Sequence, residues 1–145
     1  MKKRILNIVL FLFVLILIVN CSNSSTEPEE NIVLPDSLLN YNDHIYPLFS
    51  SKCSSRSACH AISSPAAGLI LVDYNEIRTH FMTNAPSEPL LHVGNGEGSS
   101  LYKVLIQQDF LGVPRMPYNG PYLNSNQYEG VKKWIDEGAI PFAYK

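Results

Sequence analysis

Two cysteines and an adjacent histidine constrain this chain more than any other feature. They lie in the segment SKCSSRSACH, residues 51–60, where five residues separate Cys53 from Cys59 and His60 follows directly. The 145-residue chain contains one further cysteine, Cys21. A pair of thiols beside an imidazole fits three kinds of chemistry, namely a disulfide bond, a metal site, and covalent attachment of haem.

The start of the chain is typical of an export signal. A basic KKR segment precedes an apolar run over residues 5–19, which is shorter than the ~20 apolar residues that a membrane span needs. The run ends in LIVNC, which resembles a bacterial lipoprotein signal whose cysteine, here Cys21, becomes the lipidated first residue. Residues 1–20 are then a signal peptide, and the alternative is an uncleaved anchor helix. Either way the remainder would lie in the cell envelope, facing the periplasm or the exterior.

Composition divides the remainder into a tether and one domain. Residues 21–37 are rich in Ser, Glu and Pro and have little apolar surface to bury, so we expect a flexible tether. Residues 38–145 are long enough for a single hydrophobic core. After removal of the signal, 8 Lys and Arg stand against 13 Asp and Glu, a net charge of −5. This charge argues against nucleic acid as a partner and favours basic protein partners.

Capping residues followed by apolar residues at helical spacing predict four helices, and no strand pattern stands out. The expected helices lie within residues 43–53, 73–81, 99–108 and 124–138. The first is capped by Asp43 and ends at Cys53. The second places Tyr74, Ile77 and Phe81 on one face, and the last begins with Asn124 and Gln127 as a capping box and stops at Gly138. The fold class is therefore expected to be all-α, with long loops that leave part of the core to something other than side chains.

Covalent haem attachment accounts for the order cysteine, cysteine, histidine. Two thiols form thioethers with the haem vinyl groups, and the histidine after the second thiol binds the iron. The usual motif has two residues between the cysteines, and the three extra residues here add about 10 Å of chain, which can loop out at well under ~1 kcal/mol. A disulfide between Cys53 and Cys59 stays open as an interpretation, whereas a zinc or copper site lacks an evident fourth ligand.

A haem iron with two axial ligands requires a second ligand, and Met116 is the methionine best suited to the role. Met1 belongs to the signal, and Met82 lies within or just after a predicted helix. Met116 stands in VPRMPYNGP, where the flanking prolines stiffen the backbone and would hold a weak thioether ligand in place. His80 and His92 are reserve ligands and are otherwise expected to be ordinary polar side chains.

Five motifs follow one another within residues 43–139: IYPLF…C…CH, GLIL, GEGSSLYKVL, RMPYNGPYL and VKKWIDEGA. Their order resembles a known family, the planctomycete-type and related small c-type cytochrome domains of bacterial envelope proteins. The resemblance implies a cytochrome c-like domain of about four helices whose loops wrap around one covalent haem c. It makes Cys53 and Cys59 the thioether anchors, His60 the proximal iron ligand and Met116 the distal iron ligand.

The resemblance also implies a function, that of a membrane-tethered one-electron carrier rather than an enzyme. His60 and Met116 would leave no open position on the iron, and the partners would be redox proteins of the envelope. Four residues would pack the last helix against the first: Trp134, Ile135, Gly138 and Ala139. Two alternatives stay open, a haem peroxidase or gas sensor with an open sixth site, and a haem-free, disulfide-stabilised lipoprotein module that binds at the envelope.

Overall fold

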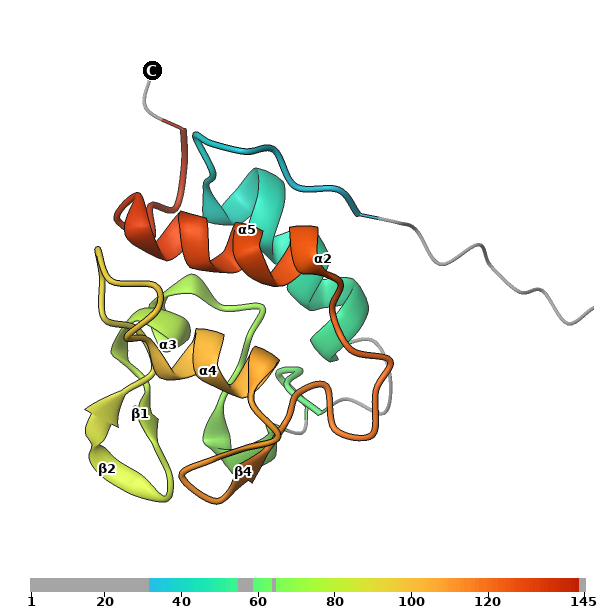
Figure 1. The fold of residues 1–145 in the computed structure, drawn as a ribbon. Helices are drawn as coiled ribbons and strands as arrows, with labels where there is room; N and C mark the ends of the chain where they lie inside the picture. The colour runs from blue at the N-terminus through green and yellow to red at the C-terminus, as the bar shows by residue number, and fades with distance from the viewer. Residues whose placement is uncertain (1–31, 55–58, 64, 144–145) are drawn as a thin grey trace, which may run out of the picture. The chain divides into compact units, whose positions relative to one another are not determined.

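A computed structural model describes residues 32–54, 59–63 and 65–143. The predicted signal peptide, the lipidation site Cys21 and most of the predicted tether lie outside these residues. The described part contains four α-helices (Figure 1): α2 (Tyr46–Phe49), α3 (Tyr74–Thr79), α4 (Ser100–Ile106) and α5 (Ser125–Asp136). Over these same residues, no helix combines the length and the apolar character needed to cross a membrane.

The first helical segment is one continuous run in which α2 is flanked by two π-helical turns, η1 (Tyr41–Ile45) and η2 (Ser50–Ser54). It begins earlier than predicted because Asn40, and not Asp43, is its cap. The Oδ1 atom of Asn40 accepts a hydrogen bond from the Asp43 backbone N–H at 2.9 Å. Cys53 lies in the last turn of the run, as predicted.

The ends of α5 agree with the prediction. Asn124 and Gln127 form a capping box, with side chain to backbone distances of 3.0 and 3.1 Å. At the other end, Gly138 has a φ of +101° and donates to the Ile135 carbonyl at 3.0 Å, while Ala139 donates to the Trp134 carbonyl at 2.8 Å. This pair of bonds is a Schellman motif, which satisfies carbonyl groups left over at a helix end.

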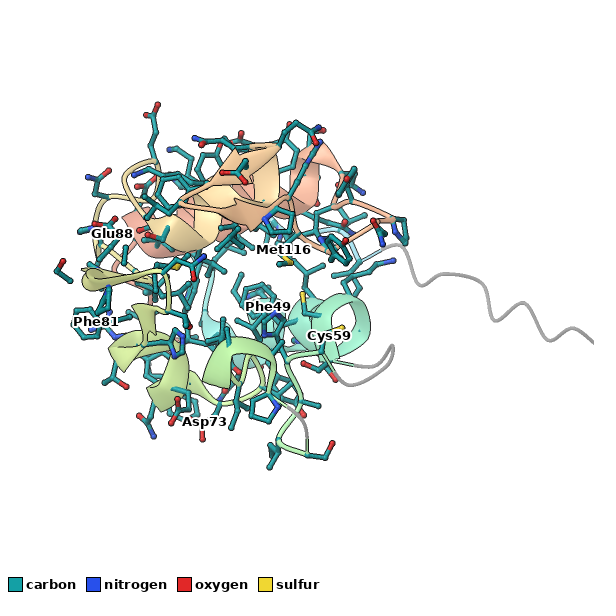
Figure 2. All side chains as sticks on the ribbon, turned by 90° about the horizontal axis from the view of Figure 1, so that it is seen from below. Phe49, Cys59, Asp73, Phe81, Glu88 and Met116 are labelled. Atoms are coloured by element: carbon teal, nitrogen blue, oxygen red, sulfur yellow. The ribbon has the colours of Figure 1, made fainter. Side chains whose placement is uncertain are left out.

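Helix α3 starts as predicted but ends at Thr79, before Phe81, which the sequence pattern places on its apolar face. The Asp73 side chain accepts from two backbone N–H groups of the first turn. The backbone leaves the helix at His80, whose carbonyl accepts instead from Leu90 N–H at 2.8 Å. Phe81 therefore lies outside the helix and is 52% exposed, at the edge of the domain in Figure 2. The prediction that Phe81 shares a helical face with Ile77 is wrong.

Two small antiparallel sheets correct the expectation of a purely all-α fold. One pairs β1 (Phe81–Met82) with β2 (Ala85–Pro89), and the other pairs β3 (Asp109–Phe110) with β4 (Val113–Pro114). Three of these strands have only two residues, which is too short for an alternating pattern to be recognised in a sequence. The described part of the chain is thus a mixture of α-helices and two-stranded sheets.

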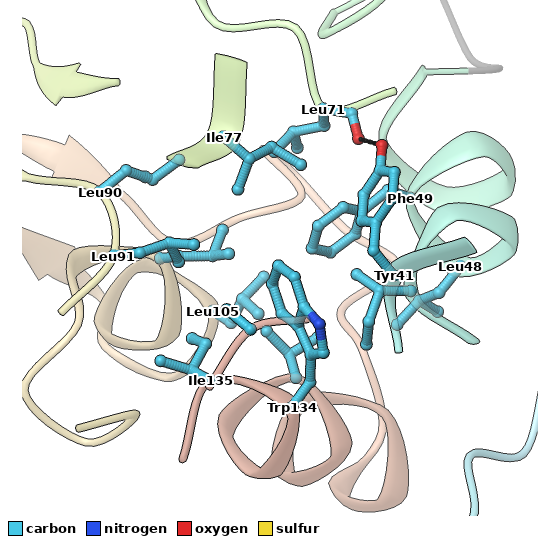
Figure 3. Close-up of a cluster of buried hydrophobic side chains, with 14 of the residues drawn as sticks. Tyr41, Leu48, Phe49, Leu71, Ile77, Leu90, Leu91, Leu105, Trp134 and Ile135 are labelled. Atoms are coloured by element: carbon cyan, nitrogen blue, oxygen red, sulfur yellow. Dashed lines mark hydrogen bonds between the residues drawn. The ribbon is translucent and has the colours of Figure 1, made fainter. Parts of the chain in front are cut away.

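The hydrophobic core lies between the first helical run, α4, α5 and the loops (Figure 3). Trp134 is fully buried, and its ring centroid lies 6.1 Å from that of Tyr41. The Tyr41 hydroxyl donates to the Leu71 carbonyl at 3.0 Å, and its backbone N–H donates to Ile140 at 2.9 Å. Ile135 and Ala139 are also fully buried. The closing helix therefore packs against the first one, as the resemblance implied.

Residues 32–39 run along α5 and are held there by its polar side chains. The Asn126 amide exchanges two hydrogen bonds with the backbone of Leu34, at 2.8 and 2.9 Å. The Glu137 carboxylate accepts from the Leu39 backbone N–H at 2.9 Å. Part of the segment that composition assigned to the tether thus makes specific contacts with the folded domain.

Candidate functional site

The backbone of His60 is held between the end of the first helical run and a later loop. Its N–H donates to the Cys53 carbonyl at 3.2 Å. Its own carbonyl accepts from the Ser54 hydroxyl at 3.2 Å and from the Leu71 N–H at 3.1 Å. The histidine that follows the second cysteine is therefore fixed against the helix that carries the first cysteine.

The His60 imidazole is oriented by a backbone carbonyl. Its Nδ1 atom lies 3.2 Å from the oxygen of Leu69. A carbonyl oxygen can only accept, so Nδ1 carries the proton and Nε2 keeps its lone pair. Burial lowers the pKa of His60, the bond to Leu69 opposes that change, and the nearby His80 lowers it again. A neutral imidazole with Nδ1 donating to a carbonyl is the usual arrangement of a histidine that binds a metal through Nε2.

The two cysteines of the motif lie in different environments. Cys53 is half-buried and packs against the hydrophobic core, whereas Cys59 is exposed, and both are free thiols. Burial raises the pKa of the Cys53 thiol to about 12, and the charge of the nearby Cys59 thiolate adds to the increase. The two thiols are therefore close in space and unequally exposed.

Met116 is held at the C-terminal end of α4. Its backbone N–H donates to the Val104 carbonyl at 2.8 Å, and its half-buried side chain packs against the hydrophobic core. The preceding residue, Arg115, donates from its backbone to Gln108 at 3.1 Å and from Nε to Leu105 at 2.9 Å. The bonds to Val104 and Leu105 satisfy carbonyl groups of the last turn of α4 that have no partner within the helix. Together with the bond to Gln108 they fix the position of the Met116 backbone.

A turn that sequence reasoning did not identify connects the two halves of the site. The Thr83 hydroxyl donates to the Ala67 carbonyl at 3.2 Å, in the loop that follows His60. The neighbouring Asn84 amide donates to the Leu111 carbonyl at 3.2 Å, in the turn between β3 and β4 that leads to Met116. The hairpin of β1 and β2 is thus bonded to both loops that carry the predicted iron ligands.

The predicted site residues border one hydrophobic core. Cys53 and Met116 both pack against it, and the buried Leu69 brings the His60 imidazole to its edge. Phe49, which is labelled with Met116 and Cys59 in Figure 2, is a fully buried member of this core. One imidazole and one thioether are too few to hold a metal ion alone, but they suffice when a porphyrin supplies four nitrogen ligands. The types of side chain present, two thiols, an imidazole and a thioether, are therefore those that would hold a haem.

Other potential ligands contribute less to the site. Within the described ranges, no three side chains of His, Cys, Asp and Glu come together as a group that could hold a metal ion. His92 is paired with Glu88, at 3.2 Å between Nε2 and Oε1. His80 is half-buried, and its charge lowers the pKa of the nearby His60. Met82 lies in β1 and is buried in the core.

Comparison of the chain with protein-family models, with curated proteins and with solved structures gives no match. What the site can do therefore follows from its own residues.

Proposed function

We propose that this protein is a monohaem c-type cytochrome that carries single electrons in the cell envelope. The observation that carries the proposal is the bond from His60 Nδ1 to the Leu69 carbonyl. It selects the tautomer that a metal ligand requires, in the residue directly after Cys59. The proposed fold is a cytochrome c-like domain in which the helices and loops enclose the haem.

Each residue of the proposed site has a separate task. Cys59 and Cys53 would anchor the haem vinyl groups, His60 would bind the iron on one side, and Met116 would bind it on the other. When bound, the haem would supply the reversible one-electron reduction of its iron. The surrounding apolar side chains, among them Phe49, would exclude water from the site.

A carrier agrees better with this arrangement than a catalyst does. The Met116 backbone is bonded to α4, so its thioether would occupy the sixth position of the iron without a large loss of entropy. A peroxidase or gas sensor needs that position to be open. The residues around the haem would then set its reduction potential and its contacts with redox partner proteins.

Attachment to the membrane through a lipid on Cys21 completes the proposal. The test is Cys21→Ser in the full chain, followed by separation of membrane and soluble fractions. We expect the variant to move to the soluble fraction, because the lipid group would be the anchor. A variant that stays in the membrane with residues 1–20 still attached would instead favour an uncleaved anchor helix.

The decisive experiment for the cofactor combines intact mass with acid-acetone extraction of the purified protein. We expect a mass increased by one haem, and haem that stays with the protein on extraction. Haem that passes wholly into the solvent would exclude covalent attachment, and a chain two protons light would favour the disulfide-stabilised module.

Two matched variants identify the anchor. If Cys59 alone forms a thioether, Cys53→Ala keeps its haem and Cys59→Ala loses most of it. Equal loss in both variants would mean that both thiols are needed in spite of the long spacer.

A further inference from the structure

The side chain of Arg115 is fixed in place beside the proposed distal ligand. Its Nε donates to the Leu105 carbonyl at 2.9 Å, and its guanidinium carbon lies 4.2 Å from the centroid of the Tyr122 ring. The residue is half-buried. Two contacts from different elements, the end of α4 and the loop before α5, therefore define the plane of the guanidinium group.

This guanidinium has no carboxylate partner among the residues that the structure describes. Lys132 pairs with Asp136, and Lys133 pairs with Glu137. Lys103 lies over the Phe110 ring, with its Nζ 5.0 Å from the centroid. Arg115 is thus a half-buried cation whose charge no carboxylate of the described residues offsets.

Capping of α4 explains only part of the Arg115 side chain. A basic residue at a helix C-terminus interacts favourably with the last carbonyl groups, and Nε does so here. The two terminal amino groups carry four further N–H donors in a planar fork, which matches the two oxygens of a carboxylate. A carboxylate would accept hydrogen bonds from these terminal N–H groups, which the cap of α4 does not use.

We infer that Arg115 is the counter-ion of a haem propionate group. The inference rests on the proposed function, because the haem supplies the carboxylate. A haem carries two propionates at its edge, and the residue next to an axial ligand is separated from it by one peptide unit of 3.8 Å. The long side chain of Arg115 can therefore reach that edge from a backbone that Met116 places beside the haem.

A guanidinium in this role would favour the reduced haem. The negative charge of a propionate stabilises the positive charge of a ferric haem. Arg115 would offset part of that negative charge, so the oxidised form would lose stabilisation relative to the reduced form. Arg115 is thus a positioning residue that also raises the reduction potential.

The test compares Arg115→Gln with Lys103→Gln in the haem-loaded protein. Both changes remove one positive charge, but only the first removes the fork. The measurements are the equilibrium constant for reduction, from a spectroelectrochemical titration, and the infrared difference spectrum of haem labelled with ¹³C at the propionates. We expect Arg115→Gln to lower the equilibrium constant on the order of tenfold and to shift the propionate bands. Lys103→Gln should change both much less, and Arg115→Lys should recover most of the equilibrium constant.

Several outcomes would overturn the inference. Equal effects of Arg115→Gln and Lys103→Gln would indicate a general charge effect, and unchanged propionate bands would exclude a direct contact. If Arg115→Gln fails to fold, the wild-type spectrum decides, since propionate bands identical to those of a water-exposed haem peptide would contradict the pairing. A chain without haem would overturn the proposed function as well, whereas a haem-loaded, Met116-ligated protein with these negative results would overturn the Arg115 pairing alone.

Discussion

The Nδ1 atom of His60 lies 3.2 Å from the carbonyl oxygen of Leu69, nine residues further along the chain. The loop between them is closed by a bond from Ala66 N–H to the Cys59 carbonyl at 2.6 Å. Two successive residues in it, Ala67 and Gly68, have positive φ values of 53° and 73°, which turn the chain back toward the histidine. The loop that follows the cysteine-histidine pair is thus shaped to orient the imidazole.

The unequal environments of the two cysteines predict unequal chemistry in the haem-free protein. At pH 8 a thiol with a pKa of about 12, as for Cys53, is ionised in only about one molecule in 10,000. We therefore expect iodoacetamide to modify the exposed Cys59 long before Cys53. Peptide mass spectrometry over a time course measures both rates. Equal modification rates of Cys53 and Cys59 in the folded protein would contradict the difference in their environments. In urea, where both thiols are exposed, the two rates should converge.

Met116 separates a carrier from a catalyst. Met116→Ala should abolish the weak absorption near the red edge of the visible range that reports a thioether bond to ferric iron. It should also lower the reduction potential and speed the binding of cyanide or carbon monoxide, because the sixth position of the iron is opened.

Met82→Leu is the matched control for that variant. Met82 is buried in β1, so a substitution that conserves volume should cost less than about 1.5 kcal/mol and leave the spectrum unchanged. If Met116→Ala leaves both the spectrum and ligand binding as they were, the distal ligand is another residue, and His80 would be tested next.

Sequence patterns predicted the parts of this fold that depend on side-chain identity. The capping box of Asn124 and Gln127, the cap at Asp73 and the buried Trp134 each have a residue-type signature, and the structure contains all three. The first helical run is capped by Asn40. Asp43, three residues later, is an equally good capping residue by type, so the sequence offers two similar starts. Local pattern alone could not choose between them.

The parts that the sequence did not predict depend on backbone groups and on distant contacts. The Leu69 carbonyl that orients His60 is a group that every residue has, so no sequence pattern marks it. The bonds of Thr83 and Asn84 to two other loops span 16 and 27 residues of the chain and involve backbone carbonyls. The sequence therefore suggests the proposed ligands, whereas the backbone groups that position them are seen only in the folded structure.

Gly130 predicts a loss of stability on substitution whose size depends on the Leu34 side chain. A Cβ atom added to this buried residue of α5 would overlap the Leu34 side chain. We expect Gly130→Ala to destabilise the domain by about 1–3 kcal/mol, the usual range for overpacking. In a Leu34→Ala background the same change should cost less, because the overlap with the end of the Leu34 side chain is removed while the Cβ atom of residue 34 stays in close contact. Urea unfolding of the four proteins measures this, and additive effects would show that the two residues do not meet.

Asp136 joins α5 to the loop before α4 and makes stability depend on pH. Its Oδ1 accepts from the Gly96 N–H at 2.6 Å, and its Oδ2 accepts from Lys132 Nζ at 2.8 Å. Burial alone would raise the pKa of Asp136, but the Lys132 and Gly96 donors outweigh it and hold the pKa below its usual range. Gly96 has no room for a Cβ atom against the Lys132 backbone, so the loop must lie close to the helix.

We expect Asp136→Asn to destabilise the domain by about 1 kcal/mol at pH 7, since the pair with Lys132 is partly exposed and adds little to the bond with Gly96. The pKa in the folded protein is lower than in the unfolded chain, so the ionised carboxylate stabilises the fold above the unfolded value. That contribution is lost as the pH falls through the folded value. The difference between wild type and Asp136→Asn in urea unfolding should therefore shrink between pH 5 and pH 2.5. Lys132→Met keeps the bond between Asp136 and Gly96, so it should reduce the free energy of unfolding less than Asp136→Asn does at pH 7. If the difference between wild type and Asp136→Asn stays constant over this pH range, the ionised carboxylate does not stabilise the fold.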